Sequence, residues 1–187
     1  MPLVAMKANR DDYGGEPVPS LLEQEVAILQ KSSRRLKQPI GLIGPGDGNA
    51  NLCEAAFQIA RRLARSGLVI VCGGRGGVME AASRGAHEAG GIVIGLLPEN
   101  DDQAANAYLT VAIPTGMGEM RNALIARSSL CLVAVGGGMG TVSEMALGLK
   151  LGKPVYSLYP DFNLPGIFIA LDVDDVVERV FQWVLQR

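Results

Sequence analysis

Three glycine-rich segments could bind a phosphate: residues 44–48 (GPGDG), 73–77 (GGRGG) and 136–141 (GGGMGT) each follow a short apolar run and precede a helical pattern. Backbone N–H groups at the start of a helix bind anions, and glycine lets a ligand approach them closely. In a parallel sheet all such turns meet at the carboxyl edge. One glycine loop could simply be a tight turn, but three together predict a phosphate or other anion site.

Two common phosphate-binding motifs do not fit these loops. A P-loop needs a lysine directly after a glycine and then a hydroxyl residue, but the only lysine that follows a glycine, Lys153, precedes Pro154. The G-x-G-x-x-G dinucleotide fingerprint is broken by Asn49 in the first loop and by Ser143 in the third. The sequence therefore excludes a P-loop NTPase and argues against NAD or FAD binding.

Two charged residues near the loops are candidates for ligand contact. Arg121 stands at the start of a predicted helix, where its guanidinium could clamp a phosphate, although a solvated surface arginine would give the same pattern. Thr141 and Glu144 form a T-x-x-E pattern: either Thr141 caps the helix and Glu144 returns the hydrogen bond, or Glu144 faces the ligand. The spacing leaves both interpretations open. His87 is the only histidine, so a multi-histidine metal site is impossible and no metal site is expected.

The composition of the 187-residue chain is that of a folded protein without a nucleic-acid or membrane partner. Apolar residues make up 48% and charged residues 19%, and 17 basic against 19 acidic residues give a net charge of −2. The longest apolar run, residues 130–135, is far shorter than the roughly 20 residues of a membrane helix. Cys53, Cys72 and Cys131 form no C-x-x-C pair and no signal-peptide pattern is present, so we expect a cytoplasmic protein.

Alternating strand and helix patterns predict the elements that position these loops. Residues 1–18 predict a flexible tail, and residues 19–187 a single domain whose leading helix, at about 21–36, opens with an S-x-x-E capping box. Strands are expected at 40–43, 68–72, 92–97, 108–113, 130–135, 155–158 and 167–171, and helices near 51–65, 77–89, 117–128, 141–151 and 174–185. Near-continuous apolar strands separated by helices indicate a Rossmann-like α/β fold, a doubly wound parallel sheet with helices on both faces.

Several spaced motifs resemble one known superfamily. Residues 135–144 (VGGGMGTVSE) are similar to the P-G-G-x-G-T-x-x-E motif of the Lonely Guy-like (SLOG) superfamily, whose members are often mislabelled lysine decarboxylases. Residues 73–80, 90–98 and 150–155 also fit, so the resemblance covers about residues 39–160. Within the superfamily the chain most resembles the molybdenum cofactor carrier proteins and their uncharacterised bacterial relatives, through residues 41–46 (GLIGPG) and 115–122 (TGMGEMRN). This implies a phosphate-bearing heterocycle, such as the molybdenum cofactor, as a carried ligand, with no cofactor that the sequence itself requires.

The same resemblance also implies an alternative, a phosphoribohydrolase that acts on purine nucleoside monophosphates. Arg121 and Glu144 match the positions that carry catalysis in that branch. Three positions depart from the hydrolase pattern: Gly136 replaces proline, Asn122 replaces lysine, and Ser143 replaces a first glutamate. A carrier is therefore the first prediction and a hydrolase the alternative. Whether the protein is an enzyme stays open, and lysine decarboxylase activity is not expected.

Two further expectations concern the partners. The helix predicted at 141–151 has an apolar arc too wide for a sheet to cover from one side, which together with the resemblance predicts a homodimer or homotetramer. The other partner is a phosphate-bearing small molecule. We expect it to contact Gly44, Pro45, Gly46, Gly73, Gly74, Arg75, Gly76, Gly77, Thr115, Gly116, Met117, Arg121, Asn122, Gly137, Gly138, Met139, Gly140, Thr141 and Glu144.

Overall fold

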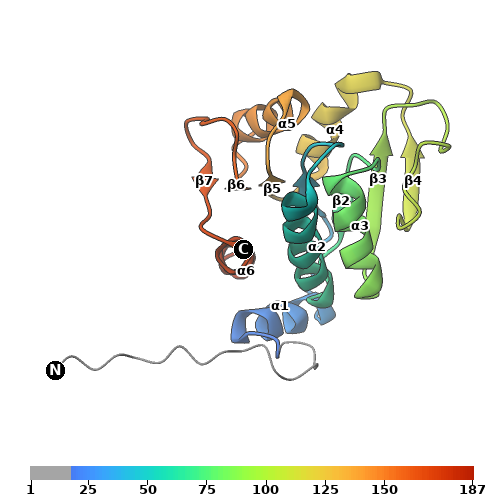
Figure 1. Cartoon of the computed structure of the whole chain (residues 1–187). Coiled ribbons are helices and arrows are strands. Elements are labelled where there is room, and N and C mark those ends of the chain that lie inside the picture. The colour runs from blue at the N-terminus through green and yellow to red at the C-terminus, as the bar shows by residue number, and fades with distance from the viewer. Residues whose placement is uncertain (1–17) are drawn as a thin grey trace.

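The computed structural model describes residues 18–187 as a seven-stranded parallel sheet between two layers of helices (Figure 1). The expected tail falls almost wholly in residues 1–17, outside the described residues. The strands are β1 (Ile40–Ile43), β2 (Ile70–Cys72), β3 (Val93–Leu97), β4 (Val111–Pro114), β5 (Leu132–Val135), β6 (Val155–Leu158) and β7 (Phe168–Ile169). The helices are α1 (Leu21–Lys31), α2 (Ala50–Arg65), α3 (Val78–Glu88), the 3-10 helix η1 (Gly118–Arg121), α4 (Asn122–Ser128), α5 (Met139–Lys150) and α6 (Val173–Leu185).

The order of the strands creates a crevice in the middle of the sheet. The sheet runs β4-β3-β2-β1-β5-β6-β7, so the chain moves outward from β1 to β4 and then returns to place β5 on the other side of β1. Gly41 of β1 pairs with Val71 of β2 on one side and with Leu132 of β5 on the other. Ligands of doubly wound folds bind where the strand order reverses, beyond the carboxyl ends of the strands. Here that point lies between β1 and β5. The predicted Rossmann-like, doubly wound fold is confirmed.

Two apolar cores hold the layers together. One face of the sheet is covered by α2, α3 and α6, and α1 packs on α6 and α2 at the edge of this layer. Figure 1 shows α2 and α3 lying side by side. The other face is covered by α4 and α5, whose Ile125, Ala126 and Met145 pack against β1, β5 and β6. The central strands β1, β2, β5 and β6 are buried along their whole length, which explains their continuous apolar runs.

Some element boundaries differ from those predicted by the sequence. The leading helix opens with the expected capping box but ends at Lys31 instead of residue 36, because the Gln30 side-chain amide forms hydrogen bonds with both backbone groups of Leu36. The strand expected at 108–113 begins only at Val111, since Tyr108 N donates to the Asn106 side chain in a turn. The helix expected at 117–128 divides into η1 and α4.

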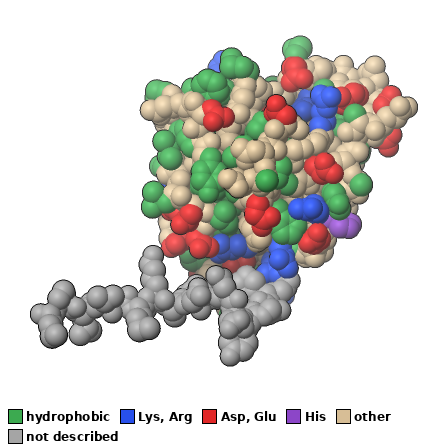
Figure 2. Space-filling view, viewed as in Figure 1, with side chains coloured by type: hydrophobic (Ala, Val, Ile, Leu, Met, Phe, Trp, Pro, Cys, Tyr) green, Lys and Arg blue, Asp and Glu red, His purple; other side chains and the backbone are tan. Residues whose placement is uncertain are grey.

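The face of the molecule seen in Figure 2 carries side chains of mixed type. On the face seen in Figure 2, acidic and basic side chains are interspersed among apolar ones. None of the helices within residues 18–187 combines the length and the apolar character that crossing a membrane requires.

Candidate functional site

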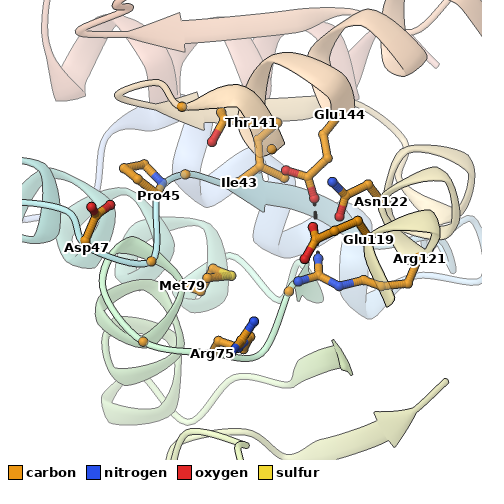
Figure 3. Close-up of a pocket in the computed structure, with 16 residues that line it drawn as sticks. Ile43, Pro45, Asp47, Arg75, Met79, Glu119, Arg121, Asn122, Thr141 and Glu144 are labelled. Carbon is orange, nitrogen blue, oxygen red and sulfur yellow. Dashed lines mark ion pairs between the residues drawn. The ribbon is translucent and has the colours of Figure 1, made fainter. Parts of the chain in front are cut away.

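A cavity of about 580 Å³ opens at the carboxyl edge of the sheet, at the reversal point between β1 and β5 (Figure 3). This volume is within the range of about 300–1,000 Å³ that is usual for small-molecule sites. The three glycine-rich loops and η1 supply most of its walls. The lining residues are Ile43, Gly44, Pro45, Gly46, Asp47, Gly73, Arg75, Gly76, Met79, Glu119, Arg121, Asn122, Gly138, Gly140, Thr141 and Glu144.

The first two glycine loops are joined to one another. The backbone N–H of Val78 donates to the Pro45 carbonyl at 3.1 Å. Gly77 has φ of +63° and lies so close to Gly46 that a Cβ would come within 2.5 Å of the Gly46 carbonyl. Glycine at position 77 is thus required both by the left-handed backbone and by the contact between the loops. The two loops form one continuous wall of the cavity.

Three of the longer helices, α2, α3 and α5, begin at this edge, and two of them leave their first N–H groups free of a side-chain cap. The N-cap of α2 is Asn49, whose side chain accepts a hydrogen bond from Leu52 N. The N-caps of α3 and α5 are Gly77 and Gly138, and neither makes a side-chain cap hydrogen bond. A helix start without a capping side chain attracts an anion through its backbone N–H groups and its dipole. The starts of α3 and α5 both adjoin the cavity.

Arg121 is a buried cation, not a surface arginine. Arg121 is only 5% exposed. Its side chain crosses the end of β2 at Gly73, where a Cβ added to the glycine would lie 2.6 Å from both guanidinium Nη atoms of Arg121. Arg121 Nη1 lies 3.5 Å from Glu144 Oε1, the contact that the dashed line marks in Figure 3. Among the described residues, Arg121 Nε is buried and has no hydrogen-bond partner. A buried N–H without a partner is costly, so this donor favours a ligand acceptor.

Glu144 faces the cavity and does not close a capping box. The helix starts two residues earlier than predicted, because Val142 N donates to the Gly138 carbonyl at 2.8 Å and makes Gly138 the N-cap. Of the two interpretations of the T-x-x-E pattern, the capping box is therefore wrong. Burial raises the pKa of the Glu144 carboxyl to about 8, although the Arg121 guanidinium acts to lower it and Glu119 adds to the rise. At neutral pH this carboxyl retains a proton.

Asn122 connects the elements around this pair, and Thr141 is buried beside it in the cavity wall. Asn122 Nδ2 donates to the Ser143 hydroxyl at 3.0 Å, which ties the start of α4 to α5. Both Asn122 and Thr141 are buried, with exposures of 6% and 3%. The Asn122–Ser143 bond holds the start of α4, where Arg121 is the N-cap, against α5, which carries Glu144.

The cavity brings together most of the residues predicted from the sequence. Those that line it are Gly44, Pro45, Gly46, Gly73, Arg75, Gly76, Arg121, Asn122, Gly138, Gly140, Thr141 and Glu144. Those that do not are Gly74, Gly77, Thr115, Gly116, Met117, Gly137 and Met139. Thr115, Gly116 and Met117 form the turn before η1, where the Thr115 hydroxyl donates to the Leu97 carbonyl and accepts from Met117 N. This turn positions Arg121 without touching the cavity itself. Met139 is 76% exposed and lies in an adjoining apolar hollow.

Four lining residues were not predicted: Ile43, Asp47, Met79 and Glu119. Asp47 lies inside the first glycine-rich segment and Glu119 stands two residues before Arg121, so an expectation of paired charges near Arg121 could have found them. Ile43 ends β1 and Met79 is in the first turn of α3. Nothing in the sequence separates these two from ordinary core residues.

The fold and the site together define an α/β protein with a polar small-molecule cavity at the reversal point of a doubly wound sheet. Comparison with known proteins identifies its family. The SLOG cluster4 family model matches residues 37–179, and the chain belongs to this family. The predicted membership of the SLOG superfamily is thereby confirmed.

The similar proteins include two molybdenum cofactor proteins of solved structure and one phosphoribohydrolase. The molybdenum cofactor binding protein of Rippkaea orientalis is 35% identical, with a TM-score of 0.75 over 80% of this chain and 99% of that one. The molybdenum cofactor carrier protein of Chlamydomonas reinhardtii is 36% identical, with a TM-score of 0.73 over 80% and 99% of the two chains. The cytokinin riboside 5'-monophosphate phosphoribohydrolase LOG5 of Arabidopsis thaliana is 36% identical over 135 residues, which cover 65% of this chain and 58% of LOG5.

Proposed function

We propose that this protein binds and carries a phosphate-bearing heterocycle in the cavity at the β1–β5 crevice, with the molybdenum cofactor as the favoured cargo. The observation that carries the proposal is the convergence of three glycine loops, two uncapped helix starts and the buried Arg121 on one cavity. The similarity to molybdenum cofactor carriers along nearly their whole length supports the same function.

The cavity suits the two parts of such a ligand. A phosphate at the start of α5 would accept hydrogen bonds from backbone N–H groups and from Arg121, whose Nε has no hydrogen-bond partner among the described residues. The apolar side chains of Ile43, Pro45 and Met79 also line the cavity and would contact the planar ring system. Polar groups that fix orientation, set among apolar ones that bury the ring, are typical of cofactor sites.

Bound small molecules identify the cargo directly. The full-length protein would be purified gently and its retained ligands identified by mass spectrometry. A phosphate-bearing pterin would support the carrier, and a nucleoside monophosphate would support the hydrolase. Titration with AMP should then show binding that weakens markedly in Arg121→Ala. An unchanged affinity in that variant would contradict the assignment of Arg121 to the ligand.

The Arg121–Glu144 pair favours one alternative, a phosphoribohydrolase. In that reaction the bond between ribose C1′ and the base nitrogen breaks, water adds to C1′, and the base takes up a proton. Because burial raises the pKa of Glu144 to about 8, its carboxyl holds a proton that it could donate to the leaving base. Purified protein should then release adenine from AMP, and Glu144→Gln should abolish release while leaving binding intact. If adenine release does not exceed that of a no-enzyme control, the hydrolase is refuted and the carrier function stands.

A second copy of the chain is the proposed macromolecular partner. A hollow of about 550 Å³ next to the cavity shares Glu119, Asn122 and Gly140 with it and is lined otherwise by Met120, Ala123, Met139, Ser143 and Leu147. Met120 and Met139 are 74% and 76% exposed in the single chain. Large exposed apolar side chains beside a ligand site mark an interface.

A further inference from the structure

Asn106 holds the second glycine loop in place, although it does not itself line the cavity. It lies in the segment between β3 and β4, and its side-chain amide reaches the loop. Asn106 Nδ2 donates to the Gly74 carbonyl at 3.1 Å and to the Arg75 carbonyl at 3.2 Å. The backbone N–H of Asn106 also donates to the Gly74 carbonyl, at 2.9 Å. Two successive carbonyls of the loop are therefore fixed on the side that Asn106 occupies.

The surroundings of Asn106 dictate which way its side-chain amide points. Its Oδ1 accepts a hydrogen bond from Tyr108 N at 3.2 Å, so the Nδ2 group must face the loop. A third acceptor of Nδ2 is the Ser83 hydroxyl, at 3.3 Å, and this hydroxyl donates in turn to the Met79 carbonyl on α3. Asn106 thus bonds the segment between β3 and β4 to the glycine loop and to the helix that follows it.

Fixing these two carbonyls also fixes the direction of the N–H groups in the same peptides. The N–H of a trans peptide points opposite to its carbonyl, so the Arg75 and Gly76 N–H groups point away from Asn106. Both residues line the cavity, and Gly76 can do so only with its backbone. Within residues 18–187 neither N–H has a hydrogen-bond partner. The loop also adjoins Arg121, whose guanidinium packs against Gly73.

We propose that Asn106 is a positioning residue for the ligand: it turns the Arg75 and Gly76 N–H groups into the cavity, where they donate to the phosphate beside Arg121. The inference rests on the proposed function, because it needs a phosphate in this cavity. The Gly76 N–H depends more on the Asn106 side chain than the Arg75 N–H does. The Gly74 carbonyl keeps its bond to the Asn106 backbone in any variant, whereas the Arg75 carbonyl has only the side-chain bond among the described residues. Without that bond, the glycine at position 76 lets the peptide rotate.

Calorimetric titration of the full-length protein with AMP tests this role. Asn106→Ala removes the donor, and Asn106→Leu removes it while nearly keeping the side-chain volume. Each should weaken AMP binding by about tenfold, which corresponds to one hydrogen bond to a charged group. The matched control is Gln30→Ala, because Gln30 Nε2 likewise donates to two backbone carbonyls, those of Leu36 and Gly67, but outside the cavity. This control should lower the melting temperature and keep wild-type AMP affinity.

Amide NMR spectra give a second readout, which a purely structural role of Asn106 would not change. In the wild-type protein AMP should shift the amide signals of Arg75 and Gly76, because both N–H groups gain an acceptor. In Asn106→Ala the shift of the Gly76 signal should shrink more than that of the Arg75 signal. In Gln30→Ala both shifts should equal those of the wild type. The wild-type measurement needs no variant to fold.

The outcomes separate the role of Asn106 from the proposed function. If AMP binds and Arg121→Ala weakens it, but the Arg75 and Gly76 signals of the wild type do not move, the role of Asn106 is refuted and the proposed function stands. Wild-type AMP affinity in folded Asn106→Ala refutes the role too, as does an equal loss of affinity in Gln30→Ala. If AMP does not bind the wild-type protein, both the proposed function and the role of Asn106 fail for nucleoside monophosphates.

Discussion

Adding one methyl group at Gly73 should disable the site while leaving the fold intact. A Cβ there would stand 2.6 Å from Arg121 Nη1, Arg121 Nη2 and Met79 Sδ. Carbon and nitrogen atoms in contact are normally more than 3 Å apart, so both side chains must move by about 1 Å. The atoms that move are the far ends of flexible side chains, and Gly73 does not have the positive φ that would strain an alanine. Gly73→Ala should therefore fold, at an overpacking cost of about 1–3 kcal/mol.

The loss of binding follows from the displacement of Arg121. A hydrogen bond from a charged donor is worth about 1.5–3 kcal/mol, so losing the aligned guanidinium should weaken AMP binding by about ten- to a hundredfold. Calorimetric titration with AMP measures this, and thermal unfolding confirms that the variant is folded. The control is Arg84→Ala, because Arg84 stacks over the Phe57 ring outside the cavity and should keep wild-type affinity. Wild-type affinity in Gly73→Ala would show that the position of Arg121 does not matter for the ligand.

Three further expectations concern stability and assembly. Because the pKa of Glu144 is raised from 4.5 to about 8, the folded protein holds a proton that the unfolded chain releases between these two values, so stability should fall as pH rises from about 4.5 to 8. The melting temperature of Glu144→Gln should lack this fall. Melting temperatures that fall in parallel for the wild type and the variant would contradict the role of Glu144. Sedimentation at micromolar concentration should show a dimer or larger oligomer that Met139→Asp weakens, whereas a wild-type monomer would refute the interface. Asn49→Ala should lower the free energy of unfolding by about 1 kcal/mol, or the melting temperature by roughly 2–4 °C, without changing AMP affinity, because the Asn49 side chain and not the ligand caps α2. Weaker AMP binding would show that the start of α2 takes part in the site.

The sequence predicted the sheet and the location of the site because both depend on local patterns. Short apolar runs that alternate with helical periods can be buried only in a parallel sheet covered on both faces. Once that fold is accepted, the three glycine loops must meet at one edge, and the structure places them around one cavity. The edges of the sheet were less predictable: β7 covers only Phe168–Ile169 of the expected 167–171, and both of its residues are exposed. Little burial fixes the ends of such a strand.

The state of the charged residues was decided by tertiary structure. The sequence left Arg121 as either a ligand contact or a surface residue, and its burial depends on the space that Gly73 leaves at the end of a different strand. The sequence likewise left Glu144 as a cap or a ligand contact. The tertiary structure decides between the two, because Gly138 is the N-cap of α5. The helix therefore starts early enough that Glu144 lies beyond the capping position and contacts Arg121. Propensity and spacing describe what a residue can do along its own helix, whereas burial, pairing and pKa depend on neighbours brought from distant elements.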